Sequence, residues 1–132
     1  MAIFGTLATS SSGLHVHRMW MDAISDNIAN INDARPTSGP AFQERFVVAT
    51  QAGNALGAGA RVAGVQFGNA TGRLVNDPTN PMADANGMVR MPDVDLGSQM
   101  THLLMAQRGY QANLAVVDRV REAYSQALTI GR

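Results

Sequence analysis

Apolar residues recur at alternating steps of three and four positions near both ends of the chain. In the N-terminal segment this stripe includes Leu14, Met21, Ile24, Ile28 and Ile31. A repeat close to 3.5 residues is typical of a helix that packs along a partner helix in a coiled coil. The stripe stops at the sequence NINDARP, where Pro36 disfavours a helical conformation for Arg35. We therefore predict a long helix within residues 1–33.

The C-terminal segment shows the same repeat over about five heptads. Its stripe consists of Leu96, Met100, Leu103, Gln107, Tyr110, Leu114, Val117, Arg121, Tyr124 and Leu128, most of them apolar. Either Asp93 or Asp95 can cap the start, because an aspartate side chain accepts a backbone N–H that has no partner in the first helical turn. We predict a second long helix within residues 93–132.

Residues 34–92 have a different character, with many glycines, prolines and turn-forming residues. Alternation of apolar and polar positions predicts short strands around residues 42–48 and 61–67, joined by the Gly-rich loop QAGNALGAGA. An Asn86-Gly87 turn precedes a third predicted strand at Met88–Met91. This region is too small to form a large core of its own.

The two helical stripes pair most simply with each other. The predicted fold is therefore mainly α, with long N- and C-terminal helices that pair as an antiparallel coiled coil and a small β-rich or irregular middle region. Apolar residues off the stripes would remain uncovered in a chain of 132 residues. They include Val16, Met19, Trp20, Leu104 and Val120. We infer that partner subunits cover these outer faces.

Composition and charge exclude several classes of partner. Ten arginines balance ten acidic residues, so the formal charge is zero, and there is no basic run that would favour nucleic acid or an anionic membrane surface. No apolar run approaches the roughly 18 residues of a membrane span. The N-terminal sequence shows no features of a cleaved signal peptide, so any export would use a route without one.

No residue pattern predicts catalysis, a cofactor or a metal site. His15 and His17 are two positions apart, so they point to different sides of a helix and cannot share a metal ion. Asp84, Asn86 and Gly87 resemble part of a calcium loop, but the later ligands of such a loop are missing. We expect a protein that is not an enzyme and has no cofactor.

The stretch MAQRGYQAN at 105–113 is unusually rich in amides for an apolar helix. Gln107 falls on the predicted stripe, where one polar residue can fix register and partner choice. Gln111 and Asn113 lie beside it, within reach of a neighbouring helix. Gly109 costs up to about 1 kcal/mol relative to alanine in a helix interior, which indicates close approach of another backbone.

Two of these segments resemble signatures of a known family. ISDNIANIND (24–33) is similar to the N-terminal signature of bacterial flagellar rod, hook and related axial proteins, and VDLGSQMTHLLMAQRGYQANLAVVD (94–118) is similar to their C-terminal signature. The segment DPTNPMADANGMVRMPDVDLGSQM (77–100) resembles the proximal-rod type. Asp26, Ile31 and Gln99 depart from the family's pattern.

This resemblance implies a structural subunit of the flagellar basal-body rod that polymerises helically through its terminal helices into the torque-transmitting drive shaft. The implied partners are further copies, other proximal and distal rod proteins, the rod-base adaptor and the flagellar type III export apparatus, with no direct membrane insertion. The implied location is the rod, which spans the periplasm. The alternative is a helical adaptor or export-associated binding module that does not polymerise.

The residues expected to make the assembly or coiled-coil interface combine the two stripes with the matched signature positions. They are Leu14, Met21, Ile24, Asn27, Ile28, Asn30, Ile31, Leu96, Met100, Leu103, Gln107, Arg108, Tyr110, Gln111, Asn113, Leu114, Val117, Tyr124 and Leu128. The outer faces are expected to contact other subunits through Val16, Met19, Trp20, Leu104 and Val120.

Overall fold

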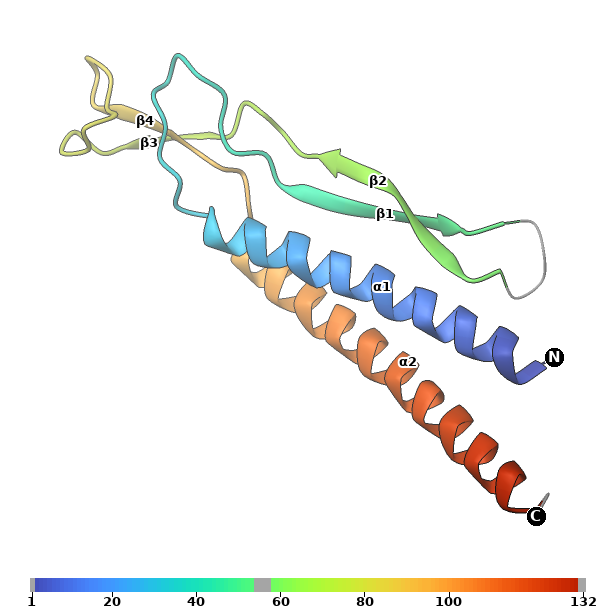
Figure 1. Ribbon diagram of the computed structural model, residues 1–132. Helices are drawn as coiled ribbons and strands as arrows, with labels where there is room; N and C mark the ends of the chain where they lie inside the picture. The colour runs from blue at the N-terminus through green and yellow to red at the C-terminus, as the bar shows by residue number, and fades with distance from the viewer. Residues whose placement is uncertain (1, 54–57, 131–132) are drawn as a thin grey trace.

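A computed structural model describes residues 2–53 and 58–130, which form two long helices and two small antiparallel sheets (Figure 1). The elements are α1 (Ala2–Ala29), β1 (Arg45–Gln51), β2 (Ala60–Phe67), β3 (Arg73–Asn76), β4 (Met88–Met91) and α2 (Leu96–Ile130). The helices run side by side in opposite directions, and the β1–β2 hairpin lies along α1. We call the end where the chain termini lie the open end, and the other the closed end.

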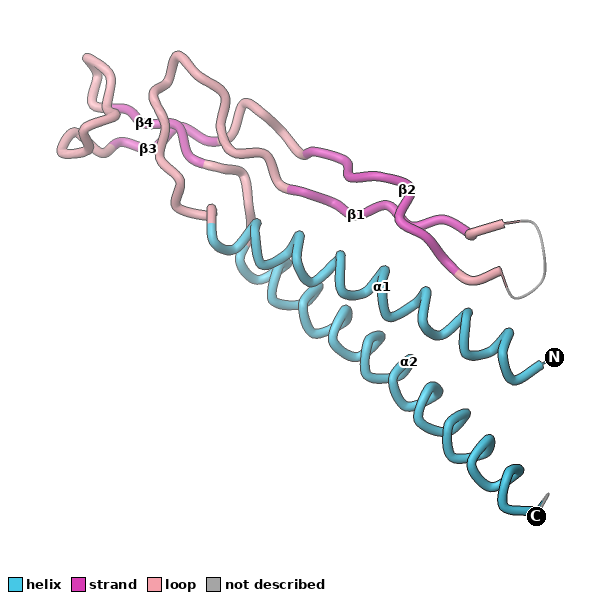
Figure 2. Tube along the Cα trace, in the orientation of Figure 1, coloured by secondary structure: helices cyan, strands magenta, loops and turns pink. Residues whose placement is uncertain are grey.

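The prediction of a mainly α, coiled-coil fold is wrong. Beside helices of 28 and 35 residues, the middle region forms four strands in two separate antiparallel pairs, so the fold is mixed α and β (Figure 2). A lone two-stranded hairpin is only marginally stable in water, and each pair here has support from outside itself. The β1–β2 hairpin packs on α1, and Arg35 forms a backbone bridge with Arg90 in β4.

The first hairpin pairs Val47 with Val65, and a bulge interrupts its register between Val48 and Ala49. It occupies the place of the first two predicted strands. β1 begins at Arg45, and the side chain of the preceding Glu44 accepts a hydrogen bond from Gln99 in α2. Residues 54–57 of the predicted Gly-rich loop lie outside the described residues.

The second hairpin begins its return strand after the predicted Asn86-Gly87 turn. Gly87 has a φ of 74°, a left-handed conformation that favours glycine. The Asp84 carboxylate accepts backbone N–H bonds from Asn86 at 2.8 Å and Met88 at 3.0 Å. The hydrogen bond from Met88 is the main cause that holds the pKa of Asp84 below its ordinary value. The turn is therefore fixed by side-chain as well as backbone hydrogen bonds.

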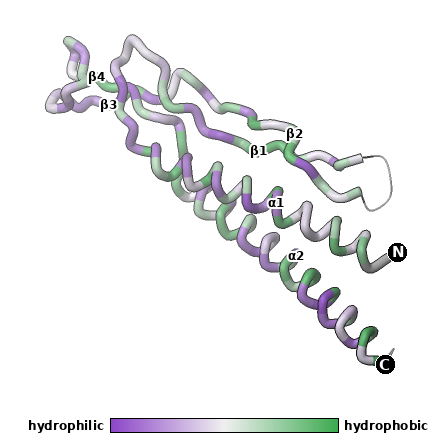
Figure 3. The backbone as a smooth tube through the Cα atoms, in the orientation of Figure 1, coloured by the Kyte–Doolittle hydropathy of each residue, from purple (hydrophilic) through white to green (hydrophobic). Residues whose placement is uncertain are grey.

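The most buried apolar residues gather mainly at the closed end, where α1 ends and α2 begins. They are Ile24, Ala41, Val89, Val94 and Ala106. Hydrophobic and hydrophilic residues alternate along α2 to the open end (Figure 3). Neither described helix is both long and apolar enough to cross a membrane. The small core therefore anchors one end of an elongated molecule.

Candidate assembly interface

One face of α2 is sheltered, and its positions recur every three or four residues, as expected for one side of a helix. We call these buried or half-buried positions the contact face of α2: Gln99, His102, Leu103, Ala106, Gly109, Tyr110, Asn113, Val117 and Val120. Contacts at several of these positions, detailed below, are with α1. The contact face thus contains glycine, alanine and amides beside larger apolar residues.

The predicted α2 stripe coincides with only part of this contact face. Leu103, Tyr110 and Val117 belong to both. The structure leaves Leu96, Met100, Gln107, Arg108, Gln111, Leu114, Tyr124 and Leu128 exposed. Met100, Gln107 and Leu114 each come one position after a sheltered residue, namely Gln99, Ala106 and Asn113. Several side chains of the stripe therefore lie beside the contact between the helices and not within it.

Two glycines create the close contact between the helices. A Cβ atom at Gly109 would lie 2.3 Å from Cε1 of His17 in α1, and one at Gly13 would lie 2.7 Å from Oδ1 of Asn113 in α2. Real Cβ atoms do not approach other atoms so closely, so each glycine leaves room for a side chain of the other helix. Asn113 also donates a hydrogen bond of 2.9 Å to the Gly109 carbonyl. The neighbour of Gly109 is thus the His17 ring of the same chain.

Trp20 joins the two helices next to this contact. Its ring centroid lies 6.1 Å from that of His17 in α1 and 6.1 Å from that of His102 in α2. Aromatic pairs at this separation stabilise packing beyond the area they bury. Trp20, predicted to face other subunits, is half-buried within the chain itself.

A buried polar cluster joins α1, α2 and β1 at the closed end. The Asn27 side chain accepts a bond from the Arg45 backbone N–H at 2.8 Å and donates to the Arg45 carbonyl at 3.0 Å. It also donates to Gln99 Oε1 at 3.1 Å, and Gln99 donates in turn to Glu44 Oε1 at 2.5 Å. Asn27 and Gln99 are each only 1% exposed. Because buried polar groups are costly when unpaired, this network fixes how the three elements meet.

The other predicted interface residues of α1 and its following turn are partly sheltered. Ile24 and Asn27 are buried, whereas Leu14, Met21, Ile28, Asn30 and Ile31 are half-buried. Among the predicted outer-face residues, Val16, Trp20 and Val120 are half-buried, and Met19 and Leu104 are exposed. These placements leave the predicted contacts with other subunits untested.

The open end of α2 has little cover. All ten residues from 121 to 130 are exposed, including Tyr124, Leu128 and Ile130. Phe4 meets Tyr124 edge-on with ring centroids 6.4 Å apart, and both remain about half or more exposed. A helix end with large apolar side chains on an open surface indicates a binding surface.

Nothing in the described part of the chain gathers three or more His, Cys, Asp or Glu side chains in a way that could hold a metal ion. Hydrogen bonds lower the pKa of Asp77, Asp84 and Asp95, which lie in turns and at a helix start. The arrangement provides packing surfaces and structural hydrogen bonds.

Several of these contact residues are absent from the sequence-based interface. Gln99 departs from the family pattern and is not on the predicted stripe, and Glu44 and Arg45 lie in the middle region. Gly13 and His17 are not apolar residues themselves, so they give no apolar signal. A four-residue spacing shared by Gly13–His17 and Gly109–Asn113 is the one pattern that could have indicated their pairing.

The chain is similar to known proteins both in its C-terminal third and over its whole length. Residues 85–130 match the family model described as flagellar basal body rod FlgEFG protein, C-terminal. The flagellar basal-body rod protein FlgC of Salmonella typhimurium is 33% identical over 135 residues, which cover 100% of both chains. That of Borreliella burgdorferi is 30% identical over 149 residues, with 98% of each chain covered.

The chain belongs to the FlgC family of flagellar basal-body rod proteins. Its FlgC relative in Bacillus subtilis is 28% identical and is also covered in full. This confirms the resemblance drawn from the two signatures and from residues 77–100. The chain is a structural component of the flagellar basal-body rod and not an enzyme, and it associates with other rod components.

Proposed function

We propose that this chain polymerises helically, with copies of itself and with neighbouring proximal and distal rod proteins, through the exposed surfaces of its two terminal helices. The polymer forms the drive shaft that transmits torque. The rod-base adaptor contacts one end of the stack. The type III apparatus exports the chain without a cleaved signal, and the assembled rod spans the periplasm.

The exposed surface of the single chain supports this proposal most directly. The chain exposes 8741 Å², whereas a compact monomer of 14.0 kDa would expose roughly 6,700 Å². The excess includes large apolar side chains on α2, such as Leu104, Leu114 and Leu128. Burial of such side chains between subunits provides the driving force for assembly.

A substitution at the open end tests assembly without disturbing the fold. Leu128 is 58% exposed in the single chain, so Leu128→Asp should leave the unfolding midpoint of the purified chain within a few degrees of the parent. In the flagellated bacterium the same variant should be made but should fail to complete rods, and motility should be lost. Electron microscopy of basal bodies and swimming assays measure both effects.

Leu128→Met is the matched control, because it keeps the side chain apolar and of similar size and should swim normally. Complete rods and normal swimming with Leu128→Asp would contradict the assembly proposal. Isolated basal bodies should contain the chain at full length; an N-terminally shortened chain would contradict export without a cleaved signal.

A further inference from the structure

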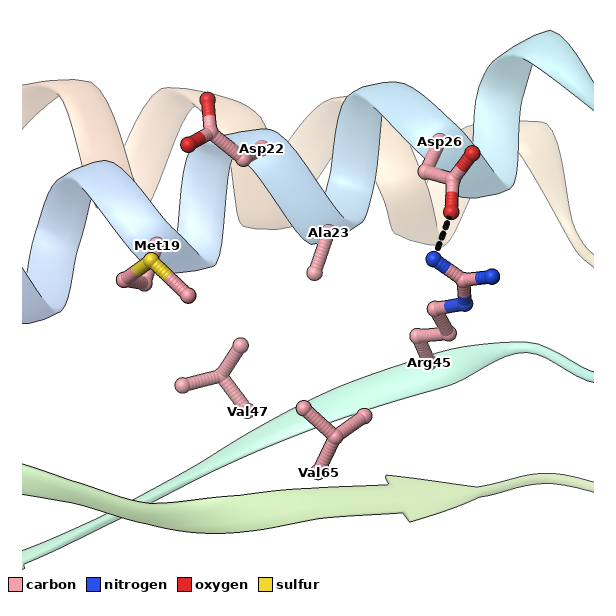
Figure 4. A pocket seen from close by; sticks show the side chains of 7 residues that line it. All are labelled: Met19, Asp22, Ala23, Asp26, Arg45, Val47 and Val65. Atoms are coloured by element: carbon pink, nitrogen blue, oxygen red, sulfur yellow. Dashed lines mark ion pairs between the residues drawn. The ribbon is translucent and has the colours of Figure 1, made fainter.

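A groove of about 500 Å³ lies between α1 and the β1–β2 hairpin. We call it the hairpin groove, and Figure 4 shows its lining: Met19, Asp22, Ala23 and Asp26 from α1, Arg45 and Val47 from β1, and Val65 from β2. Met19 and Ala23 face the two valines across the groove and form its apolar lining. The carboxylates lie along α1. The groove therefore suits an occupant with both apolar and charged groups.

The charges in the hairpin groove do not balance. Asp26 forms an ion pair with Arg45, the only cationic side chain of the lining. Asp22 is exposed and has no ion pair among the described residues. The groove thus has a net negative charge, and a cationic side chain from outside would complement it.

One exposed side of α2 has the complementary character. We call it the outer face of α2, and its exposed residues are Met105, Arg108, Ala112, Val116, Arg119 and Ala123. The alanines allow another surface to approach the helix closely. Arg108 has no ion pair among the described residues. Arg119 forms an ion pair with Glu122, with 3.6 Å between Nη1 and Oε2. Arginine also suits this role because its long apolar stem can lie against the apolar lining.

We propose that the hairpin groove of one chain receives the outer face of α2 of a second copy, with Arg108 placed against Asp22. This contact rests on the proposed polymerisation and gives it a specific pair of surfaces. The two surfaces belong to different layers, because α1 lies between the hairpin and α2 (Figure 1). Such a head-to-tail contact does not close on itself in a dimer and can repeat along a helical filament.

Paired cysteines test this geometry directly, since the chain has no cysteine of its own. Ala23→Cys places a thiol in the hairpin groove and Ala112→Cys places one on the outer face, one turn from Arg108. A short thiol-specific crosslinker applied to basal bodies with the double variant should yield a ladder of covalent oligomers. Each single variant should yield no ladder. The matched control combines Ala23→Cys with Leu114→Cys, which lies on another exposed side of α2, and it should also yield none.

Charge reversal then tests the proposed ion pair within the crosslinking variant. Asp22→Arg should abolish the ladder, and adding Arg108→Asp to the same chain should restore it. Asp22→Asn is a milder substitution that should weaken the ladder without adding a repelling charge. Restoration by the second reversal would exclude misfolding as the cause of the loss.

The outcomes separate this contact from polymerisation in general. Complete rods that contain the double-cysteine chain but give no ladder would overturn the groove contact and leave the rod subunit proposal standing. Crosslinks to a different rod protein alone, or a ladder unaffected by Asp22→Arg, would also overturn it. Failure of polymerisation itself is read from the Leu128→Asp experiment, which does not involve the groove.

Discussion

At the scale of single residues, the contact between α1 and α2 depends on two positions that have no side chain. Gly13 and Gly109 leave space that Asn113 and His17 of the opposite helix fill. The sequence indicates close packing at Gly109, because a glycine lowers the stability of a helix interior. It does not show that a histidine ring fills the space, because the spacing between two distant segments is set only by the fold.

Gly109→Ala should destabilise the chain by about 1–3 kcal/mol, because the new methyl group overlaps the His17 ring. This loss opposes the gain of up to about 1 kcal/mol that alanine gives a helix. The change in unfolding free energy, measured by circular dichroism during denaturation, checks the sign. Gly5→Ala is the matched control, since nothing lies within 4 Å of its added Cβ and it should stabilise or be neutral. Equal effects of the two substitutions would refute the steric argument.

At the scale of elements, periodicity in the sequence was sufficient to place both helices and the approximate positions of three strands. Which face of α2 is sheltered was not predictable in this way. A repeat near 3.5 residues fits the apolar Met100 and Leu114 better than the neighbouring Gln99 and Asn113, yet the sheltered positions are the amides. Strand β3 was missed because its four residues, RLVN, are too few to show alternation, whereas the equally short β4 was predicted from the Asn86-Gly87 turn before it. The buried polar cluster depends on tertiary contacts that no local pattern records.

Of the two residues predicted as possible caps of α2, Asp95 caps the helix in the structure. Its carboxylate accepts the Ser98 backbone N–H at 2.7 Å, and this bond, followed by one from the Ser98 side chain, lowers the pKa of Asp95 below its ordinary value of 3.8. A carboxyl group with a lower pKa in the folded chain stabilises the fold above its ordinary pKa, and this contribution is lost as pH falls through the lowered pKa.

Asp95→Ala should therefore lower the thermal unfolding midpoint by a few degrees at pH 7, and the difference from the parent should shrink as the pH falls below 3.8. Unfolding followed by circular dichroism at several pH values measures this. Asp93→Ala provides the control, because the structure shows no side-chain hydrogen bond for Asp93 among the described residues. A pH-independent difference for Asp95→Ala would count against the charged cap.

At the scale of the whole molecule, the buried residues are concentrated at the closed end. The buried cluster of Asn27 and Gln99 and the small apolar core lie there, whereas α2 has no sheltered residue beyond Val120 within its described length. The far end of α2 gains its apolar contacts from other subunits if the polymerisation proposal holds. Its stability is then a property of the assembly and not of the single chain.

Hydrogen exchange should reveal this difference along the chain. In the isolated protein, amides of residues 121–130 should exchange fast, and those near Gln99 and Val89 should exchange most slowly. In assembled rods, exchange over 121–130 should slow by at least about tenfold as subunits cover the helix. Exchange measured by mass spectrometry in both states checks this. Equal protection of the two ends in the dilute chain would contradict it.

The reciprocal fit of Gly13 with Asn113 and Gly109 with His17 also bears on mechanical load. A slip of one helix along the other by one turn, a rise of about 5.4 Å, would bring each bulky side chain against a position that has a Cβ atom. The helix pair therefore has a single register and resists shear. Force applied to one helix passes to the other without sliding, a property that suits the proposed transmission of torque.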